Sequence, residues 1–84
     1  MEYKVLIKLF VPEIEEVFEV YIPINKTVGE VSGLLNQLVH SLSDVFPLGG
    51  VMHIYNRRTN ELYNTGLLIR DTDIRNGTEL VMIS

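Results

Sequence analysis

The sequence contains no cysteine, no long apolar run and no excess of basic residues. Without cysteine the chain has no disulfide, thiolate metal site or cysteine nucleophile, and we expect a cytoplasmic protein. No stretch reaches the ~18 consecutive apolar residues of a membrane span, so membrane insertion is not expected. Glu2, Lys4 and Lys8 interrupt the start of the chain, which argues against a secretory signal. The net charge of −4 disfavours nucleic-acid binding, because that affinity comes mainly from Lys and Arg neutralising phosphates.

The 84 residues allow one compact domain spanning 1–84, and 46% hydrophobic with 21% charged residues predicts that it folds. Histidine is scarce. His40 and His53 lack the spacing of metal ligands, and the sequence offers no spacing from which a catalytic triad could be proposed. We therefore expect no metal, no cofactor and no catalytic residue, and the chain is not expected to be an enzyme.

Apolar and polar residues alternate with the two-residue period of half-buried strands over residues 2–10 and 17–22. These two segments are predicted to form a hairpin. The acidic residues around its turn are typical of a solvated surface, with a docking surface for a basic partner as the alternative. They are Glu13, Glu15, Glu16 and Glu19.

A helix is predicted over residues 27–42. Thr27 and Glu30 have the spacing of a capping box, in which each side chain bonds the backbone N–H of the other. Apolar residues then recur every three or four positions, while Glu30, Asn36, Gln37 and His40 fall largely on other faces. The apolar stripe comprises Val28, Val31, Leu35, Leu38 and Leu42. Pro47 and the pair Gly49-Gly50 indicate a loop after the helix.

Further strands are predicted at 51–56 and 79–83, with a short one at Leu62 and Tyr63. A brief helical turn is expected at 71–74, and Asn76-Gly77 is a turn dipeptide. This order of elements is that of the α+β β-grasp fold. It predicts a mixed four- to five-stranded sheet on one helix, with the first and last strands parallel at the centre.

Two segments resemble the ubiquitin family. Residues 22–31 are similar to its second strand and helix start, and residues 71–80 resemble its ending, in which a helical turn, an Ile and a polar turn precede the last strand. Within that superfamily the chain looks most like the bacterial YukD/EsaB-like proteins encoded with type VII (WXG100) secretion systems, although Thr78 replaces an Asp in the last turn. The resemblance implies a non-enzymatic protein-binding adaptor or accessory protein.

Two alternatives remain open. A sulfur carrier or protein modifier needs a terminal Gly-Gly, and this sequence ends in Ile83-Ser84 with its only Gly-Gly at Gly49-Gly50, so that function is disfavoured. A stand-alone regulatory β-grasp subunit of a larger enzyme is the other alternative.

The two-residue period of the strands also predicts which side chains point away from the core. One set faces the helix: Val5, Ile7, Phe18, Val20, Ile22, Met52, Ile54, Leu80 and Met82. The other set points outward: Leu6, His53, Tyr55, Val81 and Ile83. The resemblance to ubiquitin, which binds most partners through this face, makes Leu6, His53, Tyr55 and Val81 the predicted protein-binding residues. An apolar patch there is equally compatible with a homodimer interface or with ordinary surface.

Overall fold

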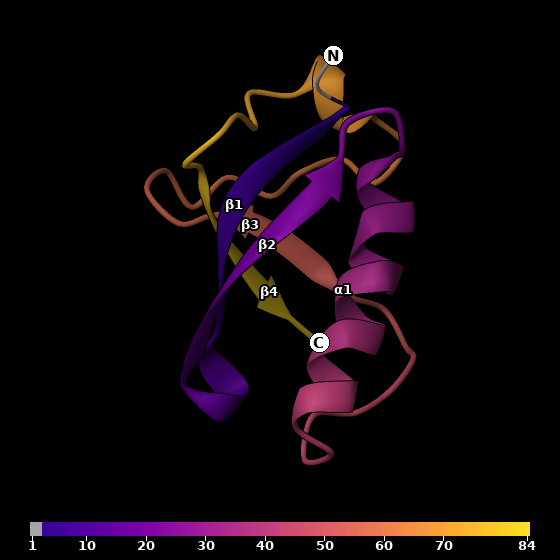
Figure 1. Cartoon of the computed structure of the whole chain (residues 1–84), viewed down its shortest axis with the longest axis vertical. Helices are drawn as coiled ribbons and strands as arrows, with labels where there is room; N and C mark the ends of the chain where they lie inside the picture. Colours follow the sequence, from indigo (N-terminus) through magenta and orange to yellow (C-terminus); the bar gives the residue numbers. More distant parts are fainter. Residues whose placement is uncertain (1–2) are drawn as a thin grey trace.

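A computed structural model describes residues 3–84 (Figure 1). Glu2, where the first strand was expected to begin, lies outside this range. The strands are β1 (Lys4–Val11), β2 (Glu16–Pro23), β3 (His53–Asn56) and β4 (Glu79–Ile83), the helix is α1 (Val28–Leu42), and the 3-10 turns are η1 (Pro12–Ile14) and η2 (Ile69–Asp71). No helix among residues 3–84 combines the length and the apolar character needed to cross a membrane.

The sheet has the order β2-β1-β4-β3 and is mixed. β1 and β2 are antiparallel and joined through η1, β1 and β4 are parallel, and β4 and β3 are antiparallel. The first and last strands are thus the central pair, as predicted. Figure 1 shows α1 lying against the sheet, and the buried side chains lie between the two.

The predicted capping box begins the helix. The Glu30 N–H donates to the Thr27 hydroxyl at 3.1 Å, and the Thr27 N–H donates to the Glu30 carboxylate at 3.1 Å. The backbone hydrogen bond from Thr27, followed by the bond to its side chain, lowers the pKa of Glu30. A carboxylate in the first turn also complements the helix dipole.

The predicted helix stripe is confirmed in its first half, whereas Leu38 is only half-buried. Val28, Val31 and Leu35 are buried, whereas Leu42 is exposed. Val39 and Phe46 are both completely buried, so Phe46 from the loop after the helix fills the end of the core in place of Leu42.

Asn36 was expected off the buried face and is in fact 3% exposed. Its amide donates to the Pro47 carbonyl at 2.9 Å and accepts from the Gly49 N–H at 2.7 Å. His40 lies in the last helical turn, with Nδ1 2.8 Å from the Phe46 carbonyl oxygen. Polar side chains of α1 therefore hold the following loop against the helix, which the periodicity alone did not indicate.

Two smaller predictions need correction. The helical turn expected at 71–74 lies earlier, at Ile69–Asp71, and Ile74 is a core residue. Leu62 makes an isolated bridge with Tyr55 and no separate strand. The expected turns at Gly49, Gly50 and Gly77 are confirmed, since each has a φ between 84° and 88° that favours glycine.

Candidate functional site

The sheet face opposite α1 is crossed by one continuous row of apolar side chains. Phe10 pairs with Val17 on one side and with Val81 on the other, and Val81 pairs with Tyr55. The bridge from Tyr55 to Leu62 extends the row beyond β3. Because paired residues point to the same side of a sheet, these five side chains are neighbours. We call Val17, Phe10, Val81, Tyr55 and Leu62 the apolar row.

The apolar row is accessible at both ends and partly buried at its centre. Val17 is 50% exposed and Leu62 is 56% exposed. Phe10, Val81 and Tyr55 are half-buried by their neighbours on the face. This row offers two aromatic rings and three aliphatic side chains to a partner.

A second row, of alternating charge, runs beside the first. Lys8 pairs with Glu19 and with Glu79. The Arg57 guanidinium is 3.7 Å from the Glu79 carboxylate, and the Arg57 N–H donates to the Glu79 carbonyl at 3.0 Å. Glu19, Lys8, Glu79 and Arg57 form this charged row, which borders the apolar row along one side.

The structure brings together three of the four predicted binding residues. Tyr55 and Val81 are directly opposite each other, and the exposed His53 lies on the same face of β3, opposite Ile83. Leu6 is set apart. It pairs with Tyr21, and the charged row lies between it and the apolar row. Along β1, Phe10 lies four positions after Leu6, which is about 13 Å of strand.

Sequence reasoning missed Phe10, the member of the apolar row between Val17 and Val81. Phe10 has the same parity as Leu6 and Lys8, so its outward direction was available from the alternation. Its position beside Val81 was not, because the parallel register between β1 and β4 cannot be read from either strand alone. The places of Val17 and Leu62 in the row likewise depend on how β2 pairs with β1 and how the 57–63 turn brings Leu62 back to Tyr55.

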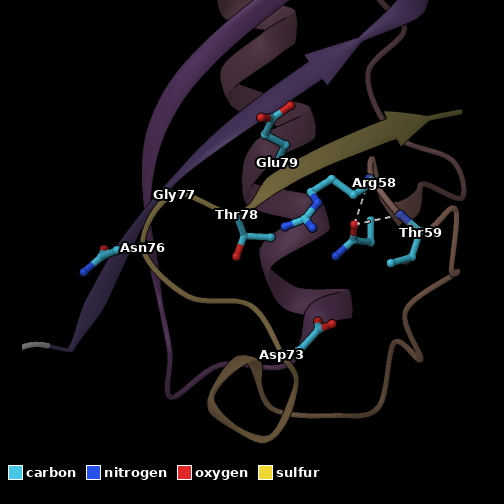
Figure 2. A pocket seen from close by; sticks show the side chains of 8 residues that line it. Arg58, Thr59, Asp73, Asn76, Gly77, Thr78 and Glu79 are labelled. Atoms are coloured by element: carbon cyan, nitrogen blue, oxygen red, sulfur yellow. Dashed lines mark hydrogen bonds between the residues drawn. The ribbon is translucent and has the colours of Figure 1, made fainter.

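A polar hollow of about 400 Å³ adjoins the charged row at Glu79 (Figure 2). Figure 2 shows the Arg58 side chain extending toward Thr78 across this hollow, with Asp73 on the opposite loop. The lining residues are Asn56, Arg58, Thr59, Asp73, Asn76, Gly77, Thr78 and Glu79.

The polar groups of the hollow hold its loops together. The Asn56 side chain accepts from the backbone N–H groups of Arg58 and Thr59, at 2.9 and 3.2 Å, and donates to the Tyr63 hydroxyl at 3.0 Å. The Tyr63 hydroxyl in turn donates to Asp73 at 2.6 Å. Asn56 thereby satisfies the backbone of the tight turn that follows β3.

Burial, followed by the hydrogen bond to Asp73, raises the pKa of Tyr63 to about 12. The phenol therefore keeps its proton at neutral pH and serves as a hydrogen-bond donor. Among residues 3–84 no cluster of three or more His, Asp or Glu side chains is placed to hold a metal ion. The hydrogen bonds of Asn56 and Tyr63 give the polar groups of this hollow a structural role.

No family model and no curated protein matches the sequence. Solved structures do share its architecture. A chain of the toluene 4-monooxygenase HD complex with the inhibitor 4-bromobenzoate superimposes with a TM-score of 0.79 at 16% identity, over 94% of this chain and 95% of that one. The ubiquitin of Caldiarchaeum subterraneum gives a TM-score of 0.67 at 13% identity, over 96% and 92%. The fold is a ubiquitin-like β-grasp.

A third similar structure belongs to a much longer protein. A chain of the MycP5-free ESX-5 inner membrane complex matches with a TM-score of 0.80 at 15% identity, over 98% of this β-grasp chain but only 21% of its own length. At such low identities these likenesses concern the fold.

Proposed function

We propose that this β-grasp protein is a non-enzymatic adaptor or accessory protein that binds another protein through the open face of its sheet. The observation that carries the proposal is the apolar row, which crosses the sheet on the side away from α1. Contiguous apolar surface of this kind typically marks a protein interaction site.

The composition of the face supports protein recognition. Tyr55 and Phe10 supply aromatic rings near the centre, and aromatic residues contribute strongly to interface energies. The charged row beside them presents alternating Glu and basic side chains, which would orient a partner more than bind it tightly. An apolar centre with a charged margin is the usual anatomy of an interface.

We also propose a biological setting, which rests on the likeness of this chain to other proteins. The sequence resembles the YukD/EsaB-like proteins of type VII secretion loci, and the fold recurs in a chain of the ESX-5 inner membrane complex. Together these favour an accessory role in a bacterial type VII secretion system.

A second candidate is a stand-alone regulatory subunit of a larger enzyme. It is favoured by the likeness to a toluene 4-monooxygenase chain that matches over 95% of its own length. Purification of the native complex separates the two candidates, because one predicts secretion components and the other an enzyme. The third alternative, a sulfur carrier or modifier, predicts a thiocarboxylate or a conjugate in the intact mass of the native protein.

The test of the sheet face begins with a photo-crosslinking amino acid at Val17, where the apolar row is exposed. The crosslinked partner is identified in native cells, and its affinity is then measured by titration with purified variants. We expect Tyr55→Ala to lower the affinity ~30-fold or more if Tyr55 is an interface hot spot, and Val81→Glu to do the same.

Tyr21→Ala is the matched control, because Tyr21 lies on the same face but on the far side of the charged row and is 62% exposed. Equal affinities for the Tyr55 and Tyr21 variants would refute the assignment. Sedimentation of the chain alone distinguishes a homodimer, in which Val81→Glu would convert dimer to monomer.

A further inference from the structure

A groove lies at the opposite side of the sheet from the apolar row, between the β1–β2 hairpin and the end of α1. Its volume is about 510 Å³. Phe18 and Ile14 are half-buried, while Leu42 and Val45 line it at 61% and 80% exposure. In Figure 1 the hairpin turn and the last turn of α1 diverge at this end of the molecule.

Two carboxylates line this apolar groove, and two more are adjacent to it in the sequence. Glu13 and Glu16 line it, and Glu15 and Asp44 are chain neighbours of lining residues. We call the groove with these four residues the acidic groove.

No positive side chain of the surrounding sequence offsets this charge. Segments 9–25 and 27–56 contain no Lys or Arg. Of the 11 Asp and Glu residues, the seven outside the acidic groove equal the seven Lys and Arg residues in number. The four carboxylates of the acidic groove therefore match the whole net charge of −4.

The helix adds to the negative potential. Leu42 and Ser43, at the C-terminal end of the 15-residue α1, line the groove, and a helix C-terminus carries a partial negative charge. Basic side chains in the last turn of a helix complement this charge, but α1 has only His40 there, with Nδ1 2.8 Å from the Phe46 carbonyl oxygen. A positive partner would complement this end of the helix.

We propose that the acidic groove binds a segment of a partner protein in which apolar side chains are flanked by Lys or Arg. The apolar side chains contact Phe18, Leu42 and Val45, and the basic flanks lie against the carboxylates. Charge complementarity selects such a segment, while an acidic peptide is repelled. This surface is separate from the apolar row, so the protein can hold two partners at once.

The probe is a short fluorescent peptide with a pair of leucines flanked by lysines, titrated against the full 84-residue chain by fluorescence anisotropy. Control peptides carry glutamate for lysine or serine for leucine. We expect only the first peptide to bind, and to bind more weakly as salt increases. Exposed charge pairs contribute little singly, so Glu16→Gln should weaken binding about threefold and the reversal Glu16→Lys about tenfold.

Val45→Ser tests the apolar part of the acidic groove, and its exposure means that the fold should tolerate it. This variant should lower the affinity for the peptide at least as much as Glu16→Gln does. Tyr55→Ala, on the apolar row, should leave the peptide affinity unchanged. Equal binding of the acidic peptide, insensitivity to salt, or loss of binding in Tyr55→Ala alone would overturn the proposal. So would a dimer of the chain that Val45→Ser dissociates, because the occupant would then be a second copy.

Discussion

The guanidinium of Arg57 lies over the ring of Phe10, with 4.5 Å between its central carbon and the ring centroid. Arg57 belongs to the charged row and directly follows β3, Phe10 belongs to the apolar row on β1, and β4 lies between these two strands. The same guanidinium is 3.7 Å from Glu79. The Arg57 side chain thus joins the two rows of the open sheet face and covers part of the Phe10 ring.

We predict that Arg57→Ala lowers the free energy of unfolding by about 1 kcal/mol, since an exposed cation–π contact is worth about 0.5–1 kcal/mol and an exposed ion pair less. Double-mutant cycles with Phe10→Leu and Glu79→Gln, measured by urea denaturation, apportion the loss. The coupling of Arg57 to Phe10 should be the larger and should persist in high salt, whereas the coupling to Glu79 should fall. The reverse order would mean that the ion pair with Glu79, and not the ring contact, is the main contribution of Arg57.

The helix contains a matched pair of glycines whose surroundings differ. A Cβ at Gly33 would meet no atom within 4 Å, whereas a Cβ at Gly29 would lie 3.2 Å from the Thr65 carbonyl oxygen. That carbonyl also accepts the Gly29 N–H at 2.9 Å, so the loop cannot move away without losing a hydrogen bond. Only Gly33 is free to take a side chain.

Gly33→Ala should therefore raise the free energy of unfolding by up to ~1 kcal/mol, because alanine is the better helix former. Gly29→Ala should gain nothing or lose stability. Thermal and urea unfolding of the two variants beside the wild type provide the measurement. Equal stabilisation by both substitutions would show that Thr65 does not constrain the helix.

The four strands of the sheet, the helix with its cap and the inward-facing set were predictable because each depends on local pattern, whereas the short strand expected at Leu62 and Tyr63 does not form. The failures depend on contacts between distant segments. Asn36 is buried because Pro47 and Gly49 bond its amide, and Leu42 is exposed because Phe46 fills the core instead. Leu6 was grouped with the other site residues because parity gives the direction of a side chain but not its row.

Because the pKa of the Tyr63 phenol is raised in the fold, we expect the protein to lose stability at alkaline pH. The folded pKa of the phenol, about 12, is above the ordinary value of 10. Because the folded state raises this pKa, the contribution of Tyr63 to stability is complete below the pKa of the unfolded state. It is lost as the pH rises through the pKa of the folded state. Tyr63→Phe should remove this loss between about pH 10 and 12, and ultraviolet titration should show one phenol fewer ionising late. Identical alkaline unfolding of the two proteins would contradict the assignment.

The acidic groove contains a residue whose replacement should stabilise the fold while weakening binding. Glu15 ends η1 with φ 54° and ψ 42°, the left-handed conformation that glycine adopts more readily. Its N–H donates to the Pro12 carbonyl at 3.1 Å, so the hairpin turn fixes this conformation. Neighbouring Glu13 and Glu16 add like-charge repulsion.

Glu15→Gly removes both costs, whereas Glu15→Gln removes only the charge. We expect the Glu15→Gly variant to have a free energy of unfolding ~1 kcal/mol higher than the Glu15→Gln variant, because a non-glycine residue in the left-handed conformation destabilises the fold by about that much. The difference should be the same in low and high salt. The advantage of Glu15→Gln over the wild type should shrink with salt, since it is electrostatic. Both variants lose the same carboxylate, so both should bind the lysine–leucine peptide about threefold more weakly. If Glu15→Gly were instead the less stable variant, the left-handed turn would be refuted, and if both bound the peptide as tightly as the wild type, Glu15 would lie outside the contact.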